Sequence, residues 1–265
     1  MAIKQKQTKI MDEKLLEKAA LQALCDNLGF EEGKVYFDLL NKKDLDLIGK
    51  EYSHSKYYRI LSSLQDSGAL AKAIIEGKDI AVYIPLPPTF LYHEEPGEEF
   101  LGILDYLENL YLKNYREIYN DAYIEINWKY KVFESLFLVK NFMKDYAIIV
   151  SGGSETYFLF KKYLPPEKLN KIKFFCRKDY SRRSDPGLNL IDPSIIGNKR
   201  TMIVDGKIIL EVLTIPQEDS YFNPNKTRYL GYLLTKSVKI KTPEGEVDFI
   251  KRSENELRKL LNIKD

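Results

Sequence analysis

Two short segments between residues 28 and 48 carry apolar residues at helical spacing, and a tight turn separates them. The first segment, residues 28–40, is predicted to be a helix that buries the face formed by Val35, Tyr36, Leu39 and Leu40. The second is predicted to be a short helix that buries Leu45, Leu47 and Ile48. Asp44 precedes it and is a favourable N-cap.

A third helical segment follows the turn at residues 52–54. Ser55 is predicted to cap its first turn, and Gly68 can take the left-handed conformation that ends a helix. The side chains that are predicted to pack inward from this helix are Tyr58, Ile60, Leu61 and Leu64.

Residues 70–84 predict two strands joined by a turn at residues 76–79, where Gly77 can adopt a positive φ. Pro85, Pro87 and Pro88 then stop the strand ladder. Three helices followed by a hairpin form a winged helix-turn-helix, whose third helix enters the DNA major groove. With a further helix predicted at residues 12–27, we expect a DNA-binding domain over residues 1–90.

The third helix offers several side chains that the hydrophobic core does not require. Lys56 and Arg59 can reach phosphates or guanine edges. The full set of expected DNA-binding residues is Ser53, His54, Ser55, Lys56, Tyr57 and Arg59, with Lys72 and Lys78 on the hairpin. Acidic and basic residues nearly cancel over residues 1–90, so a domain that contacts only proteins stays open as an alternative.

The order LGF-EEGKVYFDLL, DLDLIGKEYSHSKYYRILSSLQDSGAL and a hairpin that ends in PLPP resembles the DNA-binding domain of archaeal TrmB-like transcriptional regulators. The resemblance spans roughly residues 20 to 90, and its most specific part is the Ser55-Lys56-x-Tyr58-x-x-Leu61-x-x-Leu64 helix. Ser53-His54 replaces a common Pro-Arg, and Arg59 stands where an acidic residue is usual. The resemblance implies the fold, but it does not transfer a base specificity.

Residues 91–97 are predicted to be a linker, and residues 98–120 a helix. Its apolar positions step by three and four residues, with Asn114 in the same seam: Phe100, Leu104, Leu107, Tyr111 and Ile118. This spacing fits a dimerising coiled coil and equally a helix packed on its own chain. We assign residues 91–122 as the linker and dimerisation helix of a homodimer, because two half-sites need two readers.

Residues 123–265 have the pattern of an α/β domain. The predicted elements are strands at residues 147–150, 172–176 and 188–191, a helix at 155–163, a hairpin of strands 200–204 and 207–213, and a helix at 254–261. Asp205-Gly206 is a strong hairpin dipeptide for the turn between those two strands. The expected fold class is therefore α+β or α/β with two domains, a winged helix-turn-helix and a C-terminal α/β domain.

The order Asn198-x-Arg200-x4-Asp205-Gly206 resembles the His-x-Lys-x4-Asp motif of phospholipase D-like proteins with its key residues replaced. TrmB-like regulators often carry such a degenerate phospholipase D-like domain. That chemistry needs two histidines, and the only histidines here are His54 and His93, which lie outside the motif. We therefore expect a protein that is not an enzyme, although a carboxylate-dependent enzyme on nucleic acid stays a third hypothesis.

The turn Ser151-Gly152-Gly153-Ser154 leads from a strand into a helix, where backbone N–H groups can bind an anion or a hydroxyl-rich ligand. We group this turn with Asn198, Arg200 and Asp205 as the expected ligand-binding residues. A plain connection, with Ser154 as the N-cap, is the alternative. The resemblance to TrmB-like proteins implies a sugar effector, and the basic segment 177–183 could instead grip a phosphate.

The formal net charge of the 265 residues is +2, so affinity for DNA must come from a local surface. Cys25 and Cys176 are expected to be reduced, buried thiols, and two single histidines argue against a zinc site; we expect no cofactor. No apolar run reaches membrane-spanning length. The sequence predicts a cytoplasmic, dimeric, DNA-binding transcriptional regulator that senses a small ligand. The alternative is a non-enzymatic scaffold that binds nucleic acid or proteins.

Overall fold

The computed structural model describes residues 13–75, 82–91, 97–120, 122–127, 133–151, 153–180, 185–196, 200–216, 227–235, 238–242 and 245–263. The N-terminal elements are α1 (Glu13–Leu28), α2 (Phe30–Leu40), α3 (Leu45–Gly49), α4 (His54–Asp66), β1 (Leu70–Ile75) and β2 (Val82–Pro85). This order of three short helices after α1, followed by an antiparallel pair of strands, agrees with the sequence prediction. The turn between β1 and β2 lies outside the described residues.

The helix α2 buries the predicted face, since Val35, Tyr36, Leu39 and Leu40 are at most 3% exposed. The Tyr36 hydroxyl donates a hydrogen bond of 2.6 Å to the Leu86 carbonyl and so joins α2 to the end of the hairpin. At Gly33 the crossing with α1 is very close, because a Cβ there would lie 2.6 Å from the Cα and N of Cys25. A glycine is therefore required at this crossing.

The ends of α3 and α4 agree in part with the prediction. Asp44 caps α3 as predicted, accepting a hydrogen bond of 2.7 Å from the Asp46 amide. Gly68 has φ +77° and closes α4 in a Schellman motif, in which the amides of Gly68 and Ala69 donate to the carbonyls at positions 65 and 64. The predicted start was wrong, because α4 begins at His54 and its N-cap is Ser53, whose side chain makes no capping hydrogen bond.

Two residues that were predicted to pack inward are exposed instead. Leu47 of α3 is 54% exposed and Tyr58 of α4 is 56% exposed. The buried positions of α4 are Ile60, Leu61 and Leu64.

A mixed sheet runs through most of the described chain. Its further strands are β3 (Ala122–Asn127), β4 (Ala147–Ser151), β5 (Ile172–Arg177), β6 (Leu188–Ile191), β7 (Arg200–Val204), β8 (Ile208–Pro216) and β9 (Thr227–Leu234). The nine strands are ordered β2-β1-β3-β9-β8-β7-β4-β5-β6, and β4, β5 and β6 are parallel while the other pairs are antiparallel. The hairpin β10 (Lys239–Thr242) and β11 (Gly245–Asp248) is separate.

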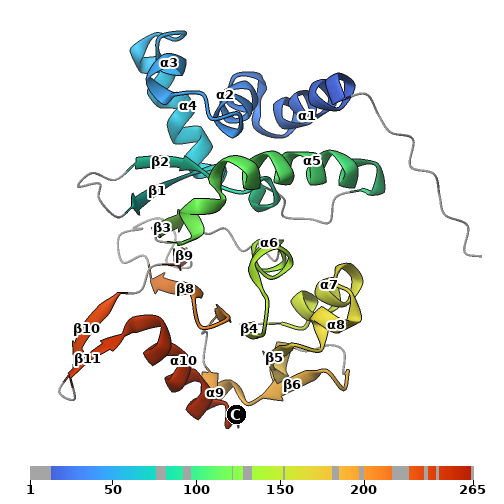
Figure 1. Ribbon diagram of the computed structural model, residues 1–265, viewed down its shortest axis with the longest axis vertical. Helices are drawn as coiled ribbons and strands as arrows, with labels where there is room; N and C mark the ends of the chain where they lie inside the picture. The colour runs from blue at the N-terminus through green and yellow to red at the C-terminus, as the bar shows by residue number, and fades with distance from the viewer. Residues whose placement is uncertain are drawn as a thin grey trace, which may run out of the picture.

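Helices cover both faces of the C-terminal part of this sheet (Figure 1). The remaining helical elements are η1 (Pro88–Leu91), α5 (Glu98–Tyr115), η2 (Arg116–Asn120), α6 (Phe133–Phe142), α7 (Glu155–Tyr163), α8 (Pro166–Leu169), η3 (Lys178–Tyr180), α9 (Pro193–Ile196) and α10 (Phe249–Leu260). Ile149 of β4 belongs to the core beneath α5, α6 and α7, whereas Ile148 and Val150 face the smaller core beneath α10. The helix α10 begins five residues earlier than predicted, where Asp248 accepts a hydrogen bond from the Lys251 amide.

The expected domain boundary at residue 90 does not interrupt the sheet. Pairing of β1 with β3 extends from Lys72 opposite Glu125 to Ile75 opposite Ala122, so the hairpin continues into the C-terminal strands. The large mixed sheet with surrounding helices confirms an α+β fold, while the layout of a separate winged helix and a phospholipase D-like domain is not confirmed. None of the described helices is long and apolar enough to cross a membrane.

The helix α5 packs on its own chain through the predicted seam. Leu107 and Tyr111 are fully buried. The Asn114 side chain donates a hydrogen bond of 2.7 Å to the Leu40 carbonyl, and the Tyr115 hydroxyl donates one of 2.5 Å to the Leu39 carbonyl. The seam thus contacts the C-terminal end of α2 in the same chain, as one of the two sequence alternatives predicted. The homodimer stays a prediction.

Two glycine-to-alanine substitutions test the crossing of α1 and α2. We expect Gly33→Ala to lower the free energy of unfolding by about 1–3 kcal/mol, because the new methyl group overlaps backbone atoms that cannot rotate away. Gly102→Ala in α5 is the matched control, since a Cβ there meets nothing within 4 Å. It should stabilise the chain by roughly 0.5–1 kcal/mol through helix propensity. Chemical denaturation measures the free energy of unfolding of both variants. An equal change in the two would contradict the close contact of α1 and α2 at Gly33.

Candidate nucleic-acid interface and ligand site

The N-terminal half of α4 presents a polar and aromatic surface to solvent. Ser53, His54, Ser55 and Arg59 are exposed, as the sequence predicted for a reading helix. Ile60, Leu61 and Leu64 hold the opposite side of α4 in the core. In Figure 1, α4 lies at one end of the molecule beside α3, far from α10. The first two turns of α4 are therefore accessible to a large partner.

Tyr57 and Tyr58 have exchanged the roles that the sequence predicted for them. The Tyr57 hydroxyl donates a hydrogen bond of 3.0 Å to the Leu45 carbonyl of α3, and burial raises the pKa of this half-buried phenol. Tyr57 therefore fixes α4 against α3 and is not free to contact a base. Tyr58 projects outward, and its ring centroid lies 4.6 Å from that of His54.

The two cations of this surface, Lys56 and Arg59, are both held by Glu31 of α2. The Lys56 ammonium forms an ion pair with one Glu31 oxygen, and the Arg59 guanidinium lies 3.7 Å from the other. Lys56 also lies over the Tyr52 ring, 5.6 Å from its centroid. Both cations remain accessible, since their side chains are 40% and 72% exposed. A phosphate that binds here must compete with the Glu31 carboxylate for both partners.

The hairpin differs from a free wing because β1 pairs on both sides. Lys72 is exposed on β1, and its ammonium lies 5.7 Å from the centroid of the Tyr83 ring on β2. Ala71 and Ala73, its neighbours along the strand, are buried on the other face. Lys78 lies outside the described residues.

The turn after β4 offers little to an anion. Ser151 is buried and its hydroxyl is 3.1 Å from that of Thr156. Ser154 is the residue before α7, is 2% exposed and makes no capping hydrogen bond. The Glu155 carboxylate lies directly against Gly153, which places a negative charge where an anion was expected. Gly152 lies outside the described residues.

Asp205 has a structural position, and it lies at the opposite end of β4 from Ser151, with which the sequence grouped it. Its carboxylate accepts hydrogen bonds of 2.8, 2.9 and 2.8 Å from the amides of Lys144, Asp145 and Tyr146. Asp205 and Gly206 both have positive φ, and the Lys207 amide donates a hydrogen bond of 2.9 Å to the Val204 carbonyl. Three residues separate the paired Val204 and Ile208, one more than the sequence predicted. Because β7 is antiparallel to β4, Arg200 lies at the end of β4 near Ser151, and Asp205 lies at the other end. Asn198 lies outside the described residues.

Gly206 allows α10 to approach this turn. The Glu254 carboxylate is buried there and accepts hydrogen bonds of 2.8 Å from the Tyr146 hydroxyl and 2.7 Å from Arg258. A side chain at Gly206 would lie 2.9 Å from Glu254. The Asp205-Gly206 pair thus ties β4, the β7–β8 hairpin and α10 together.

The structure also describes part of the basic segment 177–183 and both cysteines. Arg177 of the basic segment pairs with Asp179 at 2.5 Å, and residues 181–184 lie outside the described chain. Cys176 is buried as predicted, whereas Cys25 is half-buried and its thiol donates to the Phe30 carbonyl at 3.5 Å. Among the described residues, no cluster of three or more His, Cys, Asp or Glu side chains could hold a metal ion.

Comparison with known proteins gives one distant likeness to report. No family model and no curated protein match the sequence. The chain is similar to the solved structure of TrmBL2, described as an archaeal chromatin protein that shows a novel mode of DNA binding. The identity is 12% and the TM-score 0.28, over 93% of this chain and 96% of that chain. So distant a likeness establishes neither a common fold nor a common function.

Asp205→Asn tests whether Asp205 is structural. An asparagine keeps the positive φ but replaces one accepting oxygen with an NH₂ group that faces backbone N–H groups. We expect the free energy of unfolding to fall by about 2 kcal/mol. Asp145→Asn, at an exposed neighbouring carboxylate, should change it by less than about 0.5 kcal/mol. Equal stability of the two variants in urea denaturation would argue against the three hydrogen bonds.

Proposed function

We propose that this protein is a DNA-binding transcriptional regulator of the TrmB-like type, which reads duplex DNA with α4. The observation that carries the proposal is the exposed N-terminal half of α4, where His54, Tyr58 and Arg59 face solvent while the opposite side is locked in the core. A helix presented in this way can enter the major groove. A homodimer, a small effector and the absence of catalysis belong to the same proposal.

The chemistry of this surface suits a nucleic-acid partner. Arg59 can form a bidentate contact with guanine or phosphate, and Lys56 can neutralise a phosphate. The exposed His54 and Tyr58 rings can contact base edges or thymine methyl groups. Lys72 lies on the hairpin, where backbone contacts position a winged helix.

The experiment is fluorescence anisotropy with duplex DNA from upstream of the protein's own gene, over a series of salt concentrations. We expect sequence-selective binding that weakens as salt rises, because bound cations release counterions from the DNA. The Lys56→Ala/Arg59→Ala double variant should bind at least about tenfold more weakly. Lys251→Ala/Arg252→Ala on α10 is the matched control, since it removes one exposed lysine and one exposed arginine from another helix. If both double variants lose affinity equally, α4 is not the reading helix.

A specific observation also favours a second candidate, a scaffold whose helical domain contacts proteins. Phe30, Leu47 and Tyr58 are each more than half exposed, and all three lie on α2, α3 or α4. Exposed apolar side chains of this size are typical of protein-contact surfaces when they form one patch. Absence of selective DNA binding, together with retained folding, would favour this candidate.

Glu31→Gln tests the competition at the DNA-binding surface. Removing the carboxylate releases Lys56 and Arg59 and lowers the local negative charge, so we expect DNA affinity to rise by about two- to fivefold. Glu32→Gln is the control, because it removes the same negative charge from the neighbouring residue, whose carboxylate lies against Gly29. Anisotropy at constant salt gives both values. An unchanged or lower affinity for Glu31→Gln alone would contradict the competition.

A further inference from the structure

A cavity of about 170 Å³ lies where η1, α5, α6 and α7 meet. We call it the junction cavity. Its apolar wall includes Leu104 of α5, Phe137 of α6 and Tyr163 of α7. A cavity on the order of 150 Å³ holds one six-membered ring. The space therefore fits a small cyclic or short-chain molecule.

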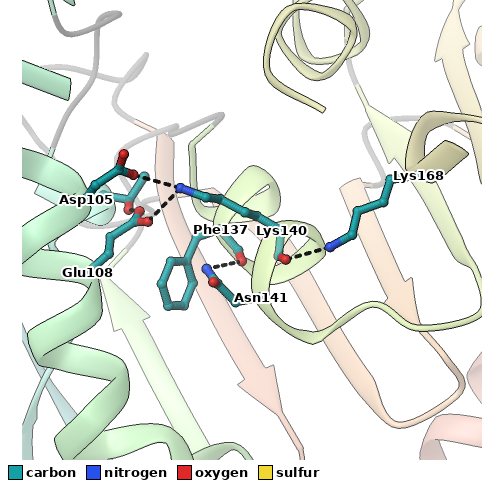
Figure 2. A network of polar contacts seen from close by, with 7 residues as sticks. Asp105, Glu108, Phe137, Lys140, Asn141 and Lys168 are labelled. Atoms are coloured by element: carbon teal, nitrogen blue, oxygen red, sulfur yellow. Dashed lines mark hydrogen bonds and ion pairs between the residues drawn. The ribbon is translucent and has the colours of Figure 1, made fainter. Parts of the chain in front are cut away.

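The polar residues that line the junction cavity form a network between α5 and α6 (Figure 2). Lys140 reaches from α6 to α5, where its ammonium lies 2.9 Å from an Asp105 oxygen and 3.3 Å from a Glu108 oxygen. The other Glu108 oxygen accepts a hydrogen bond from the buried Thr89 hydroxyl. The charged groups that line the cavity are thus two carboxylates against one ammonium.

The two carboxylates differ in their access to water. The Asp105 side chain is 63% exposed and lies at the rim, whereas that of Glu108 is only 7% exposed and lies inside. Burial raises the pKa of Glu108, because the charged form has lost water; Lys140 opposes this rise, and the nearby Asp105 carboxylate adds to it. A second cation near Glu108 would stabilise its charged form.

We propose that the junction cavity binds a small apolar molecule with one ammonium group, of about the size of benzylamine, and that its occupancy alters DNA binding by α4. The ring would lie among Leu104, Phe137 and Tyr163, and the ammonium would pair with Glu108 and Asp105, which neutralises the cluster. Aromatic walls favour a cation as well as a ring. The regulatory half of this inference rests on the proposed DNA-binding function.

The route to α4 is made of described contacts. The cavity lies along α5, whose Asn114 and Tyr115 bond to the last carbonyls of α2. At its other end, α2 carries Glu31, which holds Lys56 and Arg59 of the reading helix. A ligand that shifts α5 against α6 therefore also moves α2, whose Glu31 competes with DNA phosphates for Lys56 and Arg59.

The binding test uses the full chain with three probes of one shape: benzylamine, benzyl alcohol and benzoate. Isothermal titration calorimetry and thermal denaturation should both show binding of benzylamine, with a melting temperature that rises with its concentration. The neutral and anionic probes should bind at least about tenfold more weakly. Equal binding of benzyl alcohol or benzoate would overturn the ammonium assignment, and no binding of any probe would overturn the site.

Variants locate the ammonium. Glu108→Gln and, separately, Asp105→Asn should each weaken benzylamine binding, Glu108→Gln by about tenfold or more. Asp105 is exposed, so its substitution keeps the test open if Glu108→Gln fails to fold. Glu117→Gln is the matched control, because it removes the same charge from an exposed position of η2 that does not line the cavity. Equal loss in the Glu117 and Glu108 variants would overturn the assignment.

Regulation is read from the DNA affinity with and without saturating benzylamine, at ionic strength matched with ammonium chloride. We expect a change of at least about threefold in the native chain and none in Glu108→Gln. An unchanged DNA affinity overturns the coupling. Binding of benzylamine without any DNA binding would refute the proposed function and the regulatory half, and leave the ligand site in place. DNA binding without benzylamine binding would refute this inference alone.

Discussion

The antiparallel pairing of β1 with β3 is the interaction on which the rest of the structure depends. It places β1 inside the sheet, with β2 on one side and the C-terminal strands on the other. The helices that carry the proposed reading surface pack on this hairpin, and the Tyr36 hydroxyl fastens α2 to residue 86 just beyond it. The position of α4 is therefore set by the same sheet that carries the C-terminal helices. If β1 did not pair with β3, the position of α4 would not depend on the C-terminal strands and helices.

The second connection is α5, which contacts α2 through Asn114 and Tyr115 and α6 through Asp105 and Glu108. A cluster of three charged side chains lies on each side of this connection. On the side of α2, Glu31 is shared by Lys56 and Arg59. On the side of α6, Lys140 is shared by Asp105 and Glu108. Each arrangement leaves one charge without an equal partner, positive at α4 and negative at the junction cavity. In our account the first favours a phosphate and the second favours an ammonium group, with α5 and α2 between them.

Local sequence signals predicted local structure well, and the errors have physical reasons. Asp44, Gly68 and Asp205-Gly206 act within a few residues of themselves, so their turns and caps are confirmed. The start of α4 was placed two residues late, at Ser55 and not Ser53. Tyr57 and Tyr58 lie about 100° apart around the helix, and each stands three or four residues before a buried residue of α4, so spacing alone did not identify the inward tyrosine. The pairing of Lys140 with Glu108 and of β1 with β3 joins segments far apart in the chain, and no local pattern specifies such partners.

The central claim is that α4 contacts DNA, and a photo-cross-link tests it most directly. A benzophenone side chain would replace Tyr58, which is 56% exposed on α4, and in a second protein Leu190, which is 38% exposed on the edge strand β6. After irradiation with duplex DNA from upstream of the gene, we expect a protein–DNA adduct from position 58 and none from position 190. An adduct from position 190 alone, or equal yields from both, would contradict the assignment of α4 as the reading helix.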